Sequence, residues 1–410
     1  MLPKISLTHY RHFQGFVSVL YWKTSCRTEK FWGRHSLFFK NCIIKRHFAA
    51  ESAAENNVNF KSNSPFSVQI PQNSSYVLDS ELADQIVTAL RKNQADPNVP
   101  VLESNPGIGL VTRKLVQAGV KRVLAVEAIE EFLPSMLKLQ GELDHKVLTV
   151  FHWDYTLVWL RVVEANSIYQ QHEDAVIAYI PPKKSSDGPP LTVFTVLPEN
   201  KEAMFLLYLI MSFSGQSGFF TLGHPEWFLV ISPTLYRKLL LCKMEKDRPL
   251  AHYSPFAMCL EVLFDIHLCS ELPGWKFTPN FKTKKFKDEN LVAGVSSDMR
   301  YLIRLTPHSN VYDIIALSEV ETFLNFLRQM MSKRTQRLII RMEELVPNCG
   351  IRLIAAGHTM IEQTGDLSPY NFLQIFKEMK TWPEYDGSPM KHHLFDSAGH
   401  LFDDDPDLKS

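Results

Sequence analysis

The stretch 101–127 constrains the fold of this chain more than any other part of the sequence. An apolar run at 99–102 leads into a turn that contains Pro106, Gly107 and Gly109, and an amphipathic helical pattern follows until Gly119. A second apolar run, 123–126, ends at the acid Glu127. This order of strand, glycine turn, helix and strand predicts the first βαβ unit of a parallel sheet.

The same unit has the chemistry of an adenosine-binding site. Glycines let the backbone approach a ligand closely, and a carboxylate such as Glu127 accepts hydrogen bonds from both ribose hydroxyls. The third glycine of the dinucleotide fingerprint is missing, so NAD fits less well than S-adenosylmethionine. A turn with purely structural glycines is the alternative, because the GxG pattern by itself is common.

Strand and helix patterns continue to alternate along the chain. Helical periodicity is present at 82–90, 129–139 and 201–211, and we expect further strands at 147–151, 191–196, 218–222, 227–231 and 301–305. The alternation predicts an α/β fold with a mostly parallel, Rossmann-like sheet. Asp154 follows the third strand, where an acid commonly faces the ligand crevice of such a sheet. A surface turn is the alternative for this residue.

Beyond the last expected strand, helical periodicity takes over at 318–334, 335–345 and 368–380. The changes in pattern and composition divide the chain into five parts. We expect a targeting segment at 1–50, a flexible linker at 51–75, an α/β domain at 76–305, a helical domain at 306–390 and an acidic tail at 391–410.

Charge is unevenly distributed, although the chain has 44 basic Lys and Arg and 44 acidic side chains. Residues 1–50 contain nine Lys or Arg, and Glu29 is their single acid, which gives this part a net charge of +8. Such a start is typical of a mitochondrial targeting segment, and a basic nucleic-acid-binding arm is the alternative. The six cysteines form no CxxC pair, so we expect reduced thiols and no metal site. We expect no membrane span, because no apolar run approaches about 18–20 residues.

Together, these motifs resemble the ribosomal RNA adenine N6,N6-dimethyltransferase family, and within it the vertebrate mitochondrial branch. Tyr76-Val77 with Asp79 resembles the family's Asn-Phe-Leu-x-Asp motif, and residues 103–112 resemble Glu-x-Gly-Pro-Gly-x-Gly-x-Leu-Thr, with Asn105 in place of a glycine. The resemblance covers about residues 76–383. It implies that S-adenosylmethionine is the cofactor and that its ligands are Val77, Glu103, Gly107, Gly109, Glu127 and Asp154.

The chain departs from the family at the motif that holds the target base. Residues 193–200 fall where the family has Val-Phe-Gly-Asn-Leu-Pro-Tyr-Asn. An asparagine carbonyl localises the lone pair of the adenine amine, and an aromatic ring stacks on the flipped base. Val196 takes the asparagine position and Glu199 the tyrosine position, with Leu197 and Pro198 between them. We therefore expect no intact catalytic motif and weak or absent dimethylation.

Two basic segments are candidates for nucleic-acid binding, because cations attract phosphate and interleaved aromatic rings stack on bases. The first has Trp275, Phe277, Phe281 and Phe286 among Lys276, Lys282, Lys284, Lys285 and Lys287. The second contains Arg328, Lys333, Arg334, Arg337 and Arg341. A solvated loop and a solvated helix face are the respective alternatives. Neither segment has a zinc or helix-turn-helix pattern, so we expect salt-sensitive binding to backbones and single strands.

The resemblance implies a protein of the mitochondrial matrix (nucleoid) with one of two main roles. The first is a transcription initiation factor that works with the mitochondrial RNA polymerase, the mitochondrial HMG-box transcription factor and promoter DNA. The second is dimethylation of two adjacent adenines in the small-subunit mitochondrial rRNA. A cofactor-binding scaffold without a nucleic-acid role is a third interpretation. Val196 and Glu199 favour the first role over the second, and the basic segments favour both over the third.

Overall fold

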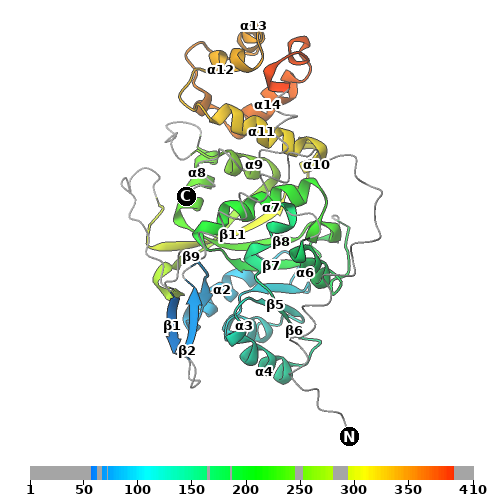
Figure 1. The fold of residues 1–410 in the computed structure, drawn as a ribbon, viewed down its shortest axis with the longest axis vertical. Coiled ribbons are helices and arrows are strands. Elements are labelled where there is room, and N and C mark those ends of the chain that lie inside the picture. The colour runs from blue at the N-terminus through cyan, green and yellow to red at the C-terminus, as the bar shows by residue number, and fades with distance from the viewer. Residues whose placement is uncertain are drawn as a thin grey trace, which may run out of the picture.

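The computed structural model describes residues 57–61, 67–71, 73–163, 167–184, 187–244, 253–279 and 294–391 (Figure 1). A central sheet lies between helices, and the C-terminal helices gather beyond it, at the top of Figure 1. This is the α/β, Rossmann-like architecture with a helical C-terminal part that the sequence predicts.

The central sheet has seven strands in the order β6-β5-β4-β7-β8-β11-β9. Neighbouring strands from β6 to β8 are parallel, and β11 runs antiparallel to both β8 and β9. All residues of β4, β5, β7 and β8 are buried, which explains why these strands are mainly apolar, with polar residues chiefly at their ends. The strands are β4 Val101–Ser104, β5 Val123–Glu127, β6 Leu148–His152, β7 Thr192–Val196, β8 Glu226–Ile231, β9 Phe264–Pro273 and β11 Met299–Pro307.

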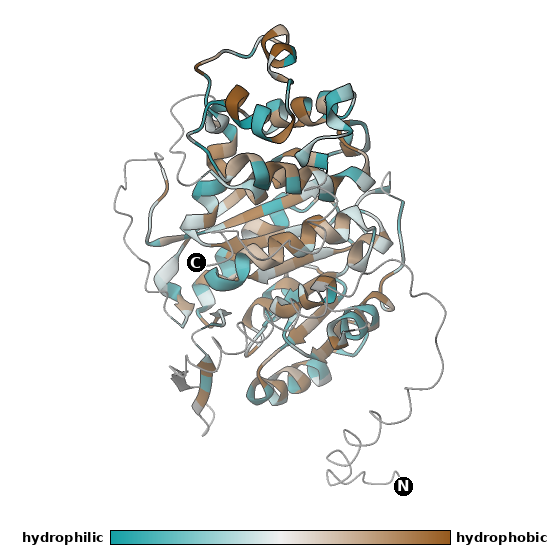
Figure 2. Cartoon of the chain, turned by 45° about the horizontal axis from the view of Figure 1, so that its top comes forward, coloured by the Kyte–Doolittle hydropathy of each residue, from teal (hydrophilic) through white to brown (hydrophobic). Residues whose placement is uncertain are grey.

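Successive strand residues enter two hydrophobic cores, one on each face of the sheet. Val101 and Val123 pack with residues of α2, α3 and α4, whereas Leu102 and Leu124 belong to the core that contains α7 and α9. The strands are mainly brown in Figure 2, as their burial requires. The helices around the sheet are α2 Ser80–Asn93, α3 Leu110–Gln117, α4 Leu133–Leu143, α5 Leu160–Val163, α6 Ile168–Ile177, α7 Glu202–Ser214, α8 Pro233–Lys243 and α9 Pro255–Leu263.

The C-terminal helices share the larger core with the sheet. Helix α11 packs against α7, α9 and α14, and its Phe323 and Phe326 contact Phe376 of α14. The three helical patterns predicted between 318 and 380 are confirmed. The helices are α10 Val311–Ile314, α11 Val320–Met331, α12 Leu338–Leu345, α13 Gly350–Ala355 and α14 Pro369–Met379.

Two apolar segments differ from the sequence prediction. The strand expected at 218–222 is wrong: Gly218–Leu222 is a 3-10 helix (η6), and Gly218 has a φ of +59°. The segment 255–273, for which no element was predicted, divides into helix α9 and the edge strand β9. Short apolar runs without polar interruption do not distinguish a buried helix from a buried strand by periodicity.

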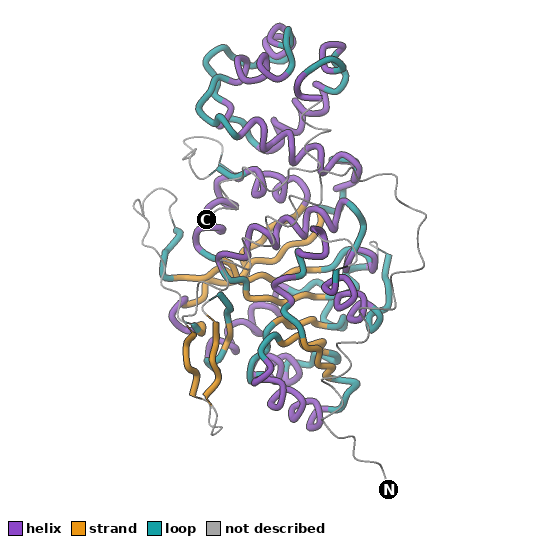
Figure 3. The backbone as a smooth tube through the Cα atoms, in the orientation of Figure 1, coloured by secondary structure: helices purple, strands orange, loops and turns teal. Residues whose placement is uncertain are grey.

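A hairpin lies within the segment that we expected to be a flexible linker. Strands β1 Asn57–Lys61 and β2 Ser67–Pro71 pair in antiparallel fashion and are separate from the central sheet (Figure 3). Val68 and Ile70, which alternate with polar residues, are buried. A second small sheet joins β3 Tyr76–Val77 to β10 Phe277–Thr278. The predicted targeting segment 1–50 and the predicted tail beyond residue 391 lie outside the described residues.

In the described part of the chain, Glu199–Leu222 is long and apolar enough to cross a membrane by length and composition alone. However, 61% of its most apolar window is buried inside the fold, and α7 within it is a core helix beside the sheet. The burial of this stretch agrees with a core role.

Candidate nucleoside-binding site

The glycine turn between β4 and α3 requires glycine at two positions. Gly107 and Gly109 have φ values of +61° and +79°. A Cβ atom on Gly109 would lie 2.7 Å from Cδ2 of Leu139, and one on Gly107 would lie 3.1 Å from the side chains of both Tyr76 and Leu78. Conformation and close packing therefore both exclude larger residues here. Asn105 also has a positive φ, +52°, which asparagine tolerates better than most residues.

Glu127 lies at the carboxyl end of β5 and is fully buried. Its Oε1 accepts hydrogen bonds from the Tyr76 hydroxyl (2.8 Å) and the Ile129 N–H (2.7 Å), while Oε2 accepts one from the Gly107 N–H (2.8 Å). Burial raises the pKa of Glu127 to about 7, although these hydrogen bonds oppose the shift. Glu127 thus ties the turn, β3 and β5 together.

Glu103 lies at the end of β4, beside the same turn. Its side chain is buried and accepts a hydrogen bond of 2.6 Å from the Thr112 hydroxyl in the first turns of α3. Burial raises the pKa of Glu103 to about 8, and the charge of Glu127 adds to the rise. This contact fixes the start of α3 against the strand that precedes the turn.

Asp154 follows β6, next to Glu127 in the sheet. Its Oδ1 accepts hydrogen bonds from the N–H (2.9 Å) and hydroxyl (2.5 Å) of Thr156, and its Oδ2 accepts one from Nζ of Lys201 (3.0 Å). Burial alone would raise the pKa of Asp154, but Lys201 and Thr156 outweigh it and the pKa is lowered. Asp154 is therefore ionised at neutral pH and paired with a lysine that is 3% exposed.

The structure brings together most of the residues that the sequence singled out as cofactor ligands. Glu103, Gly107, Gly109 and Glu127 surround one turn, and Asp154 stands at the end of the adjacent strand. Val77 is buried in β3, opposite Phe277 of β10. The turn and the three carboxylates are at the carboxyl ends of the parallel strands β4, β5 and β6, where open α/β sheets bind ligands.

Sequence reasoning gave no role to Tyr76 or Lys201, which hold the two carboxylates of the site. Tyr76 lies 51 residues from Glu127, and Lys201 lies 47 residues from Asp154. Two signals were available in the sequence: Tyr76 adds a hydroxyl where the resembling motif has phenylalanine, and Lys201 is a cation directly before the apolar helix α7.

The turn also offers unused hydrogen-bonding atoms to a ligand. Among the residues that the structure describes, the buried Ser104 Oγ and Asn105 Oδ1 have no hydrogen-bond partner. A buried polar atom without a partner is costly unless a ligand or water satisfies it. With the two carboxylates nearby, the residue types fit a nucleoside cofactor, while Tyr76 and Lys201 already engage those carboxylates.

The end of β7 and the residues that follow it, 196–199, form the predicted target-base motif. Val196 is 4% exposed and packs in the core of the α2 face, and the Leu197 N–H donates to the Val230 carbonyl (3.0 Å). Pro198 is buried, and Glu199 is exposed, where its Oε1 accepts a hydrogen bond of 2.9 Å from the Thr234 hydroxyl. The end of this strand therefore presents an aliphatic side chain and an anion.

The predicted basic segments are only partly described. Lys276 forms ion pairs with Asp79 (3.6 Å) and with Glu81, and Lys282, Lys284, Lys285 and Lys287 lie outside the described residues. Lys276, which was predicted to attract phosphate, therefore has acidic partners within the chain.

In the second basic segment, Glu344 accepts bonds from Gln336, Arg341 (2.8 Å) and Lys333 (3.1 Å), which lower its pKa to about 2. Arg341 is almost completely buried and also donates to the Gln329 carbonyl (2.6 Å). Arg337 is exposed at the start of α12, and Arg334 is partly buried. Because Glu344 forms ion pairs with Lys333 and Arg341, the positive charge of this surface is lower than the count of Lys and Arg in the sequence indicates.

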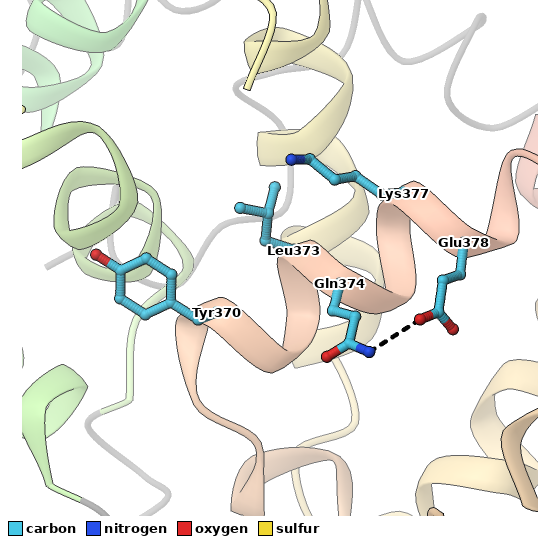
Figure 4. A pocket seen from close by; sticks show the side chains of 5 residues that line it. All are labelled: Tyr370, Leu373, Gln374, Lys377 and Glu378. Atoms are coloured by element: carbon cyan, nitrogen blue, oxygen red, sulfur yellow. Dashed lines mark hydrogen bonds between the residues drawn. The ribbon is translucent and has the colours of Figure 1, made fainter. Parts of the chain in front are cut away.

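A separate pocket lies along α14, in the C-terminal helices. It is lined by Tyr370, Leu373, Gln374, Lys377 and Glu378, and Gln374 donates a hydrogen bond of 2.9 Å to Glu378 (Figure 4). The strands that carry Glu103 and Glu127 are in the sheet below these helices in Figure 1, so this pocket is not part of the nucleoside site. Among the described residues, no group of three or more His, Cys, Asp or Glu side chains is placed to hold a metal ion.

Comparisons with known proteins agree with this geometry. A relative in Drosophila melanogaster, named dimethyladenosine transferase 2, mitochondrial, is 24% identical over 378 residues and covers 82% of each chain. The mouse protein of the same name is 23% identical over 320 residues, covering 74% of this chain and 77% of its own. The crystal structure of a dimethyladenosine transferase from Plasmodium falciparum has a TM-score of 0.51 at 13% identity, covering 74% of this chain and 97% of that chain, which shows a common fold.

The family model described as ribosomal RNA adenine dimethylase matches residues 66–381, most of the chain and nearly all of the fold described above. The resemblance that the motifs indicated is thereby confirmed. The chain belongs to the ribosomal RNA adenine dimethylase family.

Proposed function

We propose that this protein is a mitochondrial transcription initiation factor that works with the mitochondrial RNA polymerase and holds melted promoter DNA. On this proposal it has kept the dimethyltransferase fold and lost an efficient target-base site. The observation that carries the proposal is the pair Val196 and Glu199 at the end of β7, one buried and aliphatic, the other an exposed anion.

The chemistry of methyl transfer explains why this pair matters. The adenine amine is a poor nucleophile because its lone pair is delocalised into the ring, and a side-chain acceptor is needed to localise it. Val196 has no such acceptor, and losing one well-placed polar group in a catalytic site costs about 10²–10³ in rate. A stacking ring is worth roughly 1–3 kcal/mol per base. Glu199 offers no ring, and its charge repels phosphate.

S-adenosylmethionine is the cofactor that fits the residues of the site, and when bound it supplies an electrophilic methyl group. In this proposal Glu127 accepts hydrogen bonds from the ribose hydroxyls and Asp154 accepts one from the adenine amine, and Asn105 Oδ1 is a buried acceptor that has no partner within the described residues. The chain's own contribution is to orient the cofactor and exclude water from it, since these groups are largely buried.

The proposed location is the mitochondrial matrix (nucleoid). The acid-poor, basic segment 1–50 and the mitochondrial names of the relatives support it. The proposed partners are the mitochondrial RNA polymerase, the mitochondrial HMG-box transcription factor and promoter DNA. Lys282, Lys284, Lys285 and Lys287 are proposed to contact the phosphate backbone, with Arg334 and Arg337 as further candidates.

A second candidate function is dimethylation of adjacent adenines in the small-subunit mitochondrial rRNA. The family match and the retained carboxylates Glu127 and Asp154 favour it. The two functions do not exclude each other, because binding of a nucleic acid and binding of the cofactor use different residues.

Run-off transcription tests the first proposal. The full-length protein is added to purified mitochondrial RNA polymerase and HMG-box factor on a mitochondrial promoter, with matched reactions that lack it. We expect transcripts from the correct start site only when the protein is present. Equal transcription in its absence would contradict the proposal.

Methyl transfer to an RNA stem-loop with two adjacent adenines tests the loss of the base site. We expect slow transfer from labelled S-adenosylmethionine by the wild type. The double change Val196→Asn/Glu199→Tyr should raise the rate, by up to about 10²–10³-fold if the restored acceptor is well aligned. Fast turnover by the wild type that the double change does not improve would refute the argument from β7.

A further inference from the structure

We propose that Tyr76 determines the nucleoside affinity of the site, because its hydroxyl takes the place on Glu127 that a ribose hydroxyl of the cofactor would occupy. This inference depends on the cofactor site of the proposed function. Without a ligand, the Tyr76 hydroxyl occupies the acceptor position on Glu127. A nucleoside must then displace Tyr76 in order to bind.

The first observation is the number of acceptors on Glu127. A carboxylate offers about four lone-pair positions, and three of these already receive hydrogen bonds from the Tyr76 hydroxyl, the Ile129 N–H and the Gly107 N–H. Glu127 is also fully buried. Two ribose hydroxyls need two acceptor positions, so both can bind only when the Tyr76 hydroxyl has left.

The second observation is the identity of the group that approaches the glycine turn. A glycine such as Gly107 allows a ligand to approach the backbone, yet here the neighbours of a Cβ built on Gly107 are Cδ1 of Tyr76 and Cδ2 of Leu78, both at 3.1 Å. The ring of Tyr76 also packs on Phe132, with 5.2 Å between ring centroids. The ring thus packs between the turn and Phe132 and holds the Tyr76 hydroxyl on Glu127.

The third observation is a small hydrophobic cluster around this ring, separate from the two cores of the sheet. Its buried members are Val68, Ile70, Tyr76 and Phe132, and Ile108 and Ile129 pack against it. Ile108 belongs to the glycine turn, and Ile129 is two residues after Glu127. The cluster therefore lies next to the carboxylate of Glu127. Strand β2 of the hairpin contributes Val68 and Ile70, which pack in this cluster with Tyr76 and Phe132.

The protonation of Tyr76 supports its role as a hydrogen-bond donor. Burial, followed by the charge of Glu127, raises the pKa of Tyr76 well above its ordinary value. The hydroxyl therefore keeps its proton at physiological pH, and it imitates the hydroxyl of a ribose in chemistry as well as in position.

Isothermal titration of the full-length protein with S-adenosylmethionine tests this inference. Tyr76→Phe removes the competing hydroxyl and keeps the ring, and we expect it to bind about 10- to 100-fold more tightly than the wild type, as release of one hydrogen bond to a charged acceptor implies. Tyr253→Phe is the matched control, since its buried hydroxyl donates to the Leu367 carbonyl (2.9 Å) away from the site, and it should leave the affinity unchanged.

A ribose-specific readout separates this role from a merely structural one. We expect Tyr76→Phe to increase the preference for adenosine over 2′-deoxyadenosine, because a second acceptor position on Glu127 becomes available. A purely structural effect would change the affinity for both nucleosides by the same factor and would overturn the proposal.

A second variant keeps the test decisive if Tyr76→Phe folds poorly. Ile70→Ala removes packing around the Tyr76 ring, so the hydroxyl leaves Glu127 more easily, and it should also strengthen binding of S-adenosylmethionine. Unchanged or weaker binding by every folded variant, or no binding by any of them, would overturn the proposal. None of these outcomes bears on promoter-dependent transcription, so they are distinguishable from a failure of the proposed function.

Discussion

Replacing Lys201 by methionine should destabilise the protein at neutral pH, because Asp154 would lose its cationic partner. Nζ of Lys201 lies 3.0 Å from Oδ2 of Asp154 and 2.9 Å from the Thr156 hydroxyl. Breaking a fully buried ion pair costs about 3–5 kcal/mol, and an exposed pair is worth about 0–1 kcal/mol. The Asp154 side chain is 26% exposed and Lys201 is 3% exposed, so we expect an intermediate loss of about 1–3 kcal/mol in the free energy of unfolding.

The sign of the pH dependence follows from the lowered pKa of Asp154 in the folded state. A depressed carboxyl pKa contributes stability that is present above the unfolded pKa, about 3.9, and is lost as the pH falls through the folded pKa. The stability difference between wild type and Lys201→Met should therefore be full at pH 7 and shrink below about pH 4.

Urea unfolding at several pH values measures this difference, with Lys201→Arg as a control that retains the charge. A double-mutant cycle with Asp154→Asn isolates the pair itself. If Lys201→Met were as stable as the wild type at pH 7, or if its deficit did not change with pH, the assigned role of Lys201 would be refuted.

Three further predictions concern the glycine turn and its carboxylates. Gly109→Ala should lower the free energy of unfolding by about 1–3 kcal/mol, since its Cβ would meet Leu139 at 2.7 Å in a left-handed conformation, whereas Gly141→Ala, which meets nothing within 4 Å, should not. Glu103→Gln should gain stability relative to the wild type as the pH rises from 5 to 8. The pKa of Glu103 is raised to about 8 in the folded state, so the wild type loses stability as this carboxyl group loses its proton, whereas glutamine has no proton to lose. Urea unfolding at both pH values tests this. Glu127→Ala should reduce thermal stabilisation by S-adenosylmethionine, measured as the shift in melting temperature; an undiminished shift would contradict its assigned role.

The centre of the fold was predictable because its signals are local. The helical pattern at 82–90 lies within α2, which Asp79 caps through a hydrogen bond of 2.7 Å from the Leu82 N–H. Gly119 follows the end of α3 with a φ of +89°, where the sequence indicated the end of the helix. The carboxylate Glu127 closes β5 where the strand pattern placed it. Capping, turn chemistry and periodicity are properties of neighbouring residues, so they can be read without the rest of the chain.

The missed features depend on contacts between distant parts of the chain. Nothing near Tyr76 in sequence indicates that its hydroxyl meets Glu127, and nothing near Lys201 points to Asp154. Strand β9 is different, because the buried Phe264 and Ile266 alternate with the exposed Asp265 and His267, which is a local strand signal. The short apolar run 218–222 has no such alternation, and its composition does not distinguish a helix from a strand.

The most direct test of the central claim is a run-off transcription assay that compares the wild type with Glu127→Gln, each with and without S-adenosylmethionine. The account predicts equal, strong stimulation in all four reactions, because transcription needs the nucleic-acid-binding surfaces and no methyl transfer. Stimulation that requires the cofactor, or no stimulation by the wild type, would contradict it.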